Sequence, residues 1–292
     1  MPVKESLEIA EKTLDVAKEG SGLIEKFLSI SPRYRANKML LDEIENDPNM
    51  TPMEKYVAMR SLNKVKKEIM NSANIYNFAN LMLNGKGKSL EQLLPTVDDE
   101  WLGMYDDISK NVSSQEMQTV WAKILASKCE NENSISKKLL QVLQIMDSDD
   151  AKFFSYLCSR SLFIDDIDGK EFPIFFYPNS LTNNIELYDR KFVNFGILMH
   201  FSSLGLINYT TSSETIVYKN SNNLKIRYYN DKMHIISSIP KINIGVVTYT
   251  SCGIELVKIL YDGMSDSKDT MLMSKISDFY RECNYTVEFP YA

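Results

Sequence analysis

The chain is poor in the residues that reactive sites use most often. Its 292 residues include only two histidines, His200 and His234, and four cysteines. The cysteines lie far apart, at positions 129, 158, 252 and 283, and none belongs to a CxxC pair. A zinc ribbon or a dithiol redox motif is therefore not expected. Isolated cysteines are typical of a reduced protein, so we expect a cytoplasmic location.

Long apolar runs and an excess of positive charge are also missing. No run of about 18 apolar residues is present, so no membrane span is expected. Residues 1–20 are charged throughout and lack the apolar core of a signal peptide. The formal net charge of −6 makes the chain a poor general binder of polyanions. The apolar content of 44% is that of an ordinary globular protein, and the length allows two domains.

The first 160 residues show the spacing of amphipathic helices. Residues 4–30 and 33–45 are expected to be helical, with a break at Ser31-Pro32 between them. A third helix is expected at residues 51–83. Its start is marked by a threonine cap at Thr51, a proline at the first helical position and a glutamate at the third.

Four further helices follow with short loops. Residues 98–110 carry helically spaced apolar side chains, and Ser113 with Glu116 predicts a capping box for a helix over residues 114–129. Ser134 or Ser136 is expected to cap the next helix, and Asp147 or Ser148 the one after it. Short, capped connections are typical of antiparallel packed helices, so residues 1–160 are predicted to form a helical bundle.

The pattern changes after residue 161. Residues 192–204 predict a helix that Gly205 ends in a left-handed conformation. The segments 216–218, 224–229, 233–236 and 242–249 read as short antiparallel strands, and Thr250 is expected to cap a helix. This order is that of a winged-helix-like module with a small antiparallel sheet. We therefore predict an α+β protein, mainly α, with a helical domain at 1–160, a connector at 161–184 and a winged-helix-like domain at 185–292.

Two segments resemble known ligand loops only in part. GKGKS, at residues 85–89, has Met82 where a phosphate-binding loop needs its first glycine, so it is interpreted as a basic turn. The acidic run around Asp165 has Ile164 and Phe175 at two calcium-ligand positions, so it is interpreted as a solvated turn. No cofactor and no metal site are predicted.

The histidines and the acidic doublets give no assembled catalytic group. His200 and His234 lie among apolar residues, which is typical of packed positions. The acidic groups at 98–100, 106–107 and 149–150 fall in first turns or on polar faces of the expected helices, where negative charge is favourable. No catalytic residue is predicted. An enzyme with a dispersed site around His200 or the acidic doublets is kept as a second alternative.

The C-terminal module offers basic residues with tyrosines among them. Such residues can bind phosphates or stack on bases, and they suit a protein partner equally well. The candidate contact residues are Arg190, Lys191, Lys219, Lys225, Arg227, Tyr228 and Lys232.

Several segments together resemble a bacterial family known as domain of unknown function 2806. The strongest match is residues 98–154, DDEWLGMYDDISKNVSSQEMQTVWAKILASKCENENSISKKLLQVLQIMDSDDAKFF. LIEKFLSISPRYRANKM (residues 23–39), NIYNFANLML (74–83), GLI (205–207) and TSCGIEL (250–256) are also similar to the family. The resemblance implies a helical, cytosolic bacterial protein and supplies no catalytic residue. Neighbouring families of similar build are associated with defence against phage and abortive infection.

The leading hypothesis is a non-enzymatic interaction or regulatory protein that acts in bacterial antiphage defence and binds a protein partner or itself. The first alternative is a regulator that binds nucleic acid through the C-terminal module.

Overall fold

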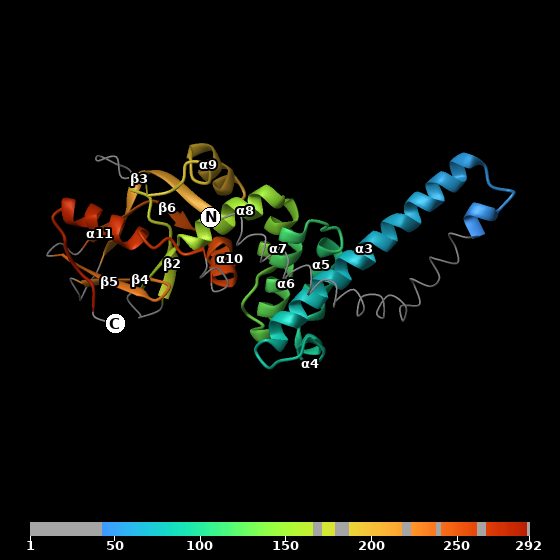
Figure 1. Ribbon diagram of the computed structural model, residues 1–292, viewed down its shortest axis with the longest axis horizontal. Coiled ribbons are helices and arrows are strands. Elements are labelled where there is room, and N and C mark those ends of the chain that lie inside the picture. The colour runs from blue at the N-terminus through green and yellow to red at the C-terminus, as the bar shows by residue number, and fades with distance from the viewer. Residues whose placement is uncertain are drawn as a thin grey trace. The chain divides into compact units, whose positions relative to one another are not determined.

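The computed structural model describes residues 43–165, 171–178, 187–217, 223–237, 241–261 and 267–290. The chain divides by packing into two units, Met1–Glu132 and Asn133–Ala292, and each is described by itself (Figure 1). The helix expected at residues 4–30 lies outside the described residues. Of the helix expected at residues 33–45, only the end is described, and residues 43–46 are helical.

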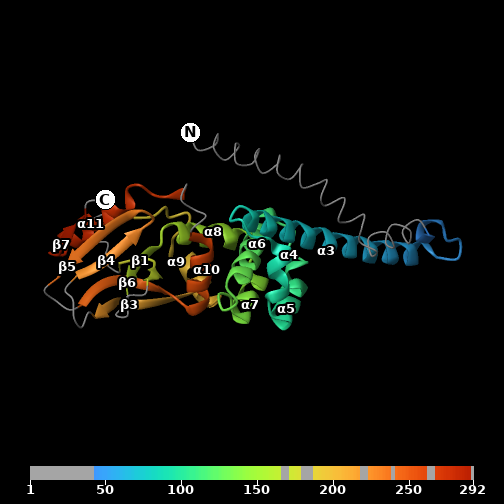
Figure 2. The ribbon, with the colours of Figure 1, turned by 90° about the horizontal axis from the view of Figure 1, so that it is seen from below.

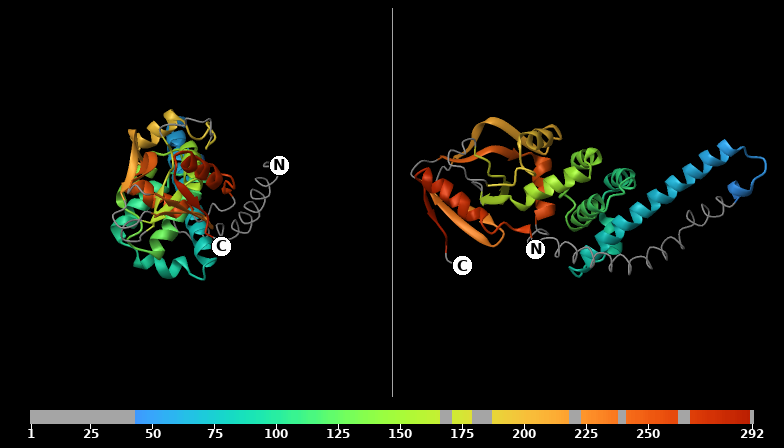
Figure 3. Two further views of the ribbon diagram at one scale, coloured as in Figure 1. Left: turned by 90° about the vertical axis from the view of Figure 1, so that its left-hand side faces the viewer. Right: turned by 45° about the horizontal axis from the view of Figure 1, so that its top comes forward.

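The first unit is built on one long helix. α3 (Pro52–Asn84) begins at the predicted capping box, in which Thr51 and Glu54 satisfy each other's backbone N–H groups. Its second half buries one stripe of side chains and contacts α4 (Leu90–Leu93), α5 (Asp99–Ser109) and α6 (Gln115–Glu130). A short 3₁₀ helix, η1 (Leu94–Thr96), joins α4 to α5. Figures 1 and 3 show the first half of α3, in blue, running on beyond these helices.

Three aromatic side chains form the centre of the first unit. Trp101 and Tyr105 of α5 and Trp121 of α6 are all buried. The Tyr105 ring stacks on Trp101 and meets Trp121 edge-on, with ring centroids 5.2 Å apart in both pairs. The Tyr105 hydroxyl donates a hydrogen bond of 2.8 Å to the Trp121 carbonyl oxygen. This bond connects α5 to α6 at the point where both are most deeply buried.

The cap of α6 differs from its prediction by one residue. Ser114, not Ser113, is the N-cap, and its hydroxyl accepts a hydrogen bond from the Met117 amide. Ser113 lies instead at 3.5 Å from the Asn71 amide nitrogen of α3. Serine is a favourable cap residue at both positions, and the contact of Ser113 with α3 depends on tertiary packing that the local pattern does not show.

The second unit begins with α7 (Lys137–Ile145) and α8 (Ser148–Ser159). Ser136 caps α7, and Asp147 with Asp150 forms the capping box of α8. Both helices contact α10 (Ser251–Tyr261), which explains why packing divides the chain after Glu132, whereas composition changes near residue 161. The other described helices of this unit are α9 (Phe195–Ser203) and α11 (Leu272–Glu282).

Two antiparallel sheets complete the second unit. The larger has the order β2 (Glu171–Ile174), β1 (Leu162–Asp165), β4 (Asn223–Tyr228), β5 (Asp231–Ile236) and β7 (Thr286–Glu288), as Figure 2 shows for most of its strands. The smaller pairs β3 (Ile207–Val217) with β6 (Lys241–Tyr249). The fold class is thus confirmed: the protein is mainly α, with a helical N-terminal region and small antiparallel sheets.

The hairpin expected around residues 224–236 is present as β4–β5, but it is not a free wing. β1 pairs with β4 on one side, and β7 pairs with β5 on the other. Both outer strands come from distant parts of the chain, so the sequence pattern of the hairpin could not show them.

The GLI and TSCGIEL segments meet in space. Gly205 has the predicted positive φ, 75°, after α9. The Thr250 hydroxyl donates to the Gly205 carbonyl oxygen at 2.6 Å, and the Thr250 amide donates to the Leu206 carbonyl oxygen at 3.1 Å. Gly253 lies so close that a Cβ added there would be 1.9 Å from the Leu206 oxygen. The end of α9 and the start of α10 are therefore joined backbone to backbone.

Candidate functional site

The predicted contact residues of the β4–β5 hairpin lie on opposite faces of the sheet. Lys225 and Lys232 are exposed on the outer face, and Arg227 is half-buried there. Tyr228 is buried on the inner face, where its hydroxyl donates to the Ser159 carbonyl oxygen at 2.8 Å. Strand alternation separates Tyr228 from the basic residues, so it is not available to a ligand at the outer face. Lys219 lies outside the described residues.

The basic side chains of this face have acidic neighbours. Arg227 makes two hydrogen bonds to the Glu171 carboxylate, at 2.7 and 2.6 Å, and its guanidinium lies 4.6 Å from the centre of the Phe163 ring. The Lys225 ammonium lies 4.0 Å from the Asp165 carboxylate. These pairs neutralise much of the charge that a phosphate would need.

The Arg227–Glu171 pair should make the stability of the fold depend on pH in the acidic range. The hydrogen bond from Arg227 lowers the pKa of Glu171 below its usual 4.5. A lowered pKa in the folded state means that the pair stabilises the fold above about pH 4.5 and stops doing so as pH falls through the lowered value. We expect Glu171→Gln to cost about 1 kcal/mol at neutral pH, since the pair is partly exposed, and almost nothing near pH 3. Urea unfolding of both proteins across this range measures the difference, and an equal cost at both pH values would contradict it.

Arg190 and Lys191 precede α9 and are exposed. The Lys191 ammonium lies 5.4 Å from the centre of the Phe192 ring, and the Lys191 amide donates to the Asp189 carboxylate at 2.8 Å. In α9 itself Phe195 and Met199 point outward as exposed apolar side chains. This helix therefore presents apolar rather than basic side chains.

The structure brings together His200 and Asp150, which lie fifty residues apart in the sequence. The His200 Nε2 atom lies 2.7 Å from the Asp150 Oδ1 atom. The other Asp150 oxygen accepts the Asp147 amide at 3.0 Å, as part of the α8 capping box. Among the described residues neither side chain is hydrogen-bonded to a hydroxyl or a thiol. The pair joins α9 to α8, and the Asp150 carboxylate is also part of the capping box at the start of α8.

The remaining candidate groups also have structural partners. Lys86 and Lys88 of the GKGKS turn bind the two Glu130 oxygens at 2.6 and 2.8 Å. Burial raises the pKa of the Cys129 thiol to about 11, which keeps it protonated. No group of three His, Cys, Asp or Glu side chains among the described residues could hold a metal ion.

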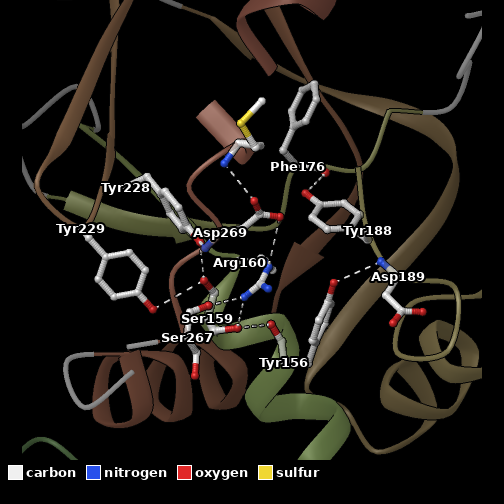
Figure 4. A network of polar contacts seen from close by, with 11 residues as sticks. Tyr156, Ser159, Arg160, Phe176, Tyr188, Asp189, Tyr228, Tyr229, Ser267 and Asp269 are labelled. Atoms are coloured by element: carbon white, nitrogen blue, oxygen red, sulfur yellow. Dashed lines mark hydrogen bonds and ion pairs between the residues drawn. The ribbon is translucent and has the colours of Figure 1, made fainter. Parts of the chain in front are cut away.

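A cluster of tyrosines around Arg160 was not found from the sequence. Figure 4 shows it at the end of α8. The Arg160 Nη1 atom donates to the Ser159 hydroxyl at 2.8 Å and to the Ser267 carbonyl oxygen at 2.6 Å. The guanidinium lies 4.6 Å from the centre of the Tyr156 ring and its Nε atom 3.7 Å from the Asp269 carboxylate.

The tyrosine hydroxyls of this Arg160 cluster act as hydrogen-bonding groups rather than as acids. Burial raises the pKa of Tyr188, Tyr228 and Tyr229. The Tyr188 hydroxyl donates to the Phe176 carbonyl oxygen at 2.5 Å, and the Tyr228 hydroxyl accepts the Asp269 amide at 2.9 Å. The cluster thus ties the end of α8 to β4 and to the segments after β2 and before α11. Because the groups it joins are up to about a hundred residues apart, no local sequence signal could have revealed it.

The first half of α3 carries more exposed large apolar side chains than any other described helix. No residue of α3 before Asn71 is buried. Met53, Tyr56 and Val57 are 68%, 59% and 52% exposed. Helical spacing places three exposed basic residues on the same face. This face, called the α3 stripe below, consists of Met53, Tyr56, Val57, Arg60, Lys64 and Lys67.

These observations define a mainly helical α+β protein with an exposed apolar and basic face on its longest described helix. A family model described as "Protein of unknown function (DUF2806)" matches residues 55–272, well over half of the chain. The chain belongs to this family, as the resemblance in residues 98–154, 205–207 and 250–256 implied. No curated protein and no solved structure is significantly similar to it. None of the described helices is long and apolar enough to cross a membrane.

Proposed function

We propose that the protein is a non-enzymatic interaction protein that binds a partner protein through the α3 stripe. The observation that supports this is the exposure of Met53, Tyr56 and Val57 at successive positions of one helical face. Neighbouring apolar side chains that are exposed together often mark a binding surface. Tyrosine, methionine and arginine are also the residues in which interface centres are enriched.

The charge of the α3 stripe indicates the chemistry of the partner. Between Pro52 and Met70 the chain has five basic residues and two acidic ones, a net charge of +3. Arg60, Lys64 and Lys67 follow the apolar end of the stripe along α3. The complementary surface is therefore an apolar pocket with carboxylates along one side.

The setting that we propose for this interaction is bacterial antiphage defence. The support is the association of similarly built neighbouring families with abortive infection, which is an analogy between folds. In that setting partner binding through the α3 stripe would regulate the response to infection.

Nucleic acid is a less favoured partner for the C-terminal module. Lys225 and Arg227 face Asp165 and Glu171, and Tyr228 is buried. Phosphate binding at this face would have to replace two ion pairs that the fold already makes. On the α3 stripe the ion pair among the described residues is that of Lys64 with Glu68 of the same helix, at 3.8 Å.

The experiment compares two alanine variants of the full chain. Tyr56→Ala with Val57→Ala removes the apolar end of the α3 stripe without changing charge. Ile145→Ala, at a side chain that is 65% exposed in α7, is the matched control. The native chain is captured from nuclease-treated bacterial lysate, and the partner found by mass spectrometry is then purified and titrated. We expect the double variant to bind at least about tenfold more weakly, which corresponds to about 1.4 kcal/mol, and the control to bind like the native chain.

Two outcomes would contradict the proposal. One is a purified partner that binds the double variant as tightly as the native chain. The other is a partner that is recovered only when the nuclease treatment is left out, which would make nucleic acid the mediator.

A further inference from the structure

The helix α9 presents an apolar surface that carries no full charge. Its nine residues include no Asp, Glu, Lys or Arg. Phe195 and Met199, one turn apart, are 66% and 46% exposed. The Phe195 ring meets the Tyr209 ring of β3 edge-on, with ring centroids 5.9 Å apart, so Phe195 is held in its outward position. Two large apolar side chains fixed side by side on a surface are typical of a contact that another molecule covers.

Positive charge lies at the start of α9. Residues 189–191 include Arg190 and Lys191 against one aspartate, so their net charge is +1. Both basic side chains are exposed. The Lys191 ammonium lies 5.4 Å from the centre of the Phe192 ring, which stacks on Tyr156 of α8 with centroids 4.7 Å apart. Lys191 therefore lies at a defined place beside the beginning of the apolar surface.

Negative charge lies at the other end of α9. The His200 Nε2 atom lies 2.7 Å from the Asp150 Oδ1 atom, so the first turn of α8 is beside the second half of α9. Asp149 is exposed in that turn. Lys152 lies 3.3 Å from Asp149, but residues 147–152 have three acidic residues and one basic residue, a net charge of −2. The surface called the α9 face below consists of Lys191, Phe195, Met199 and Asp149.

We propose that the α9 face binds the same face of a second copy of the chain, with the two α9 helices antiparallel. A two-fold axis at Ile197, midway between the two apolar side chains, would bring Phe195 of each copy beside Met199 of the other. The start of each α9 then lies opposite the end of the other. Lys191 of one copy therefore meets Asp149 of the second copy, and the contact occurs twice.

The opposite charges at the two ends favour a second copy over other occupants. A nucleic acid or an anionic membrane would be attracted by residues 189–191 and repelled by residues 147–152. A second copy satisfies both ends at once, as a self-complementary face requires. Because each face offers only two large apolar side chains, the dimer should be weak and should dissociate as salt concentration rises.

Sedimentation velocity of the full chain tests the α9 face by an exchange of charges. At about 100 μM protein and low salt the native chain should be dimeric. Lys191→Glu and Asp149→Lys each place like charges together at both contacts, so each variant alone should dimerise at least about tenfold more weakly. An equimolar mixture of the two variants should dimerise again, because each new charge would face its opposite in the other variant.

Two further variants make the result specific. Lys138→Glu changes the net charge as Lys191→Glu does, at an exposed side chain of α7, and should leave the dimer unchanged. Phe195→Ser with Met199→Ser removes the apolar middle without changing charge, and should weaken dimerisation at least about tenfold. Circular dichroism checks that every variant stays folded.

Each of the opposite outcomes overturns the proposal. A native chain that stays monomeric up to about 100 μM overturns it, as does a dimer that persists in both charge variants. A mixture of the two variants that stays monomeric overturns the antiparallel contact. A monomer that co-sediments with phosphatidylglycerol vesicles assigns the face to a membrane instead.

This proposal goes beyond the proposed function, because it concerns a different surface and a different occupant. Dimerisation should not respond to Tyr56→Ala with Val57→Ala, and partner binding at the α3 stripe should not respond to Phe195→Ser with Met199→Ser. The two proposals can therefore fail separately.

Discussion

Replacing Gly253 by alanine is expected to unfold the unit formed by Asn133–Ala292. The new Cβ atom would lie 1.9 Å from the Leu206 carbonyl oxygen and 3.0 Å from its carbonyl carbon. Both are backbone atoms, so no side-chain rotation relieves the clash. The Thr250 amide and hydroxyl bind the same oxygen at 3.1 and 3.2 Å, so α10 cannot move away without losing its cap. The cost should exceed the 1–3 kcal/mol that is typical of overpacking and reach the whole stability of a typical domain, about 5 kcal/mol or more.

Two other substitutions distinguish the backbone clash at Gly253 from the effects of an added methyl group and of a lost cap hydroxyl. Gly103→Ala is the control for adding a methyl group within a helix, since the added Cβ would meet no atom within 4 Å in α5. It should stabilise the protein by about 0.5–1 kcal/mol. Thr250→Val removes the cap hydroxyl without a clash and should cost about 1 kcal/mol.

Circular dichroism and tryptophan fluorescence together locate the effect. Both tryptophans, Trp101 and Trp121, belong to the first unit, so fluorescence reports only on that unit. We expect Gly253→Ala to lose the dichroism of the second unit. A Gly253→Ala protein that melts within a few degrees of the native chain would show that the contact between the GLI and TSCGIEL segments is not rigid.

Local signals in the sequence predicted the helix boundaries well. Several predicted helix starts and ends depend only on interactions within one turn of chain, and the structure confirms them. They are Thr51 with Glu54, Gly205, Thr250 and, each from a pair of alternatives, Ser136 and Asp147. The one wrong cap is Ser113, whose neighbour Ser114 is an equally favourable cap residue. The positions of β4, β5 and β6 were predictable for the same reason, because alternation and turn residues are local. β1, β7 and most of β3 were not predicted.

Pairings between distant residues could not be predicted. Nothing near Arg227 in the sequence indicates that β2 brings Glu171 to it across the sheet face. Likewise, His200 and Asp150 are fifty residues apart and meet only because α9 packs beside α8. The hypothesis of a basic binding surface failed to anticipate these partners, since composition counts charges but does not show which ones neutralise each other.

The apolar end of α3 shows a different limit of the sequence. Met53, Tyr56 and Val57 belong to a strongly capped helix, and a capped helix with apolar residues is normally expected to bury them. Only the structure shows that burial in α3 begins at Asn71. The first half of α3, which carries the proposed function, has the local sequence pattern of an ordinary helix. The sequence alone therefore did not indicate an exposed surface there.

Replacing Trp121 by alanine is expected to destabilise the first unit by about 3–5 kcal/mol. The side chain is fully buried and meets the Tyr105 ring edge-on at 5.2 Å. Its loss leaves a cavity between α5 and α6 that the stacked Trp101 and Tyr105 rings cannot fill without leaving their own contacts. Trp101 remains as the only tryptophan, so urea unfolding followed by its emission, with excitation selective for tryptophan, measures the free energy of this unit alone.

Tyr105→Phe is the matched variant for this aromatic core. It keeps the ring and removes only the hydroxyl that donates to the Trp121 carbonyl oxygen. The expected cost is about 1 kcal/mol, that of one buried hydrogen bond. If both variants lost the same stability, the hydrogen bond and not aromatic packing would hold α5 against α6. A smaller loss of stability for Trp121→Ala than for Tyr105→Phe would mean that α5 and α6 move together and fill the cavity. Three tightly packed rings should prevent such a movement.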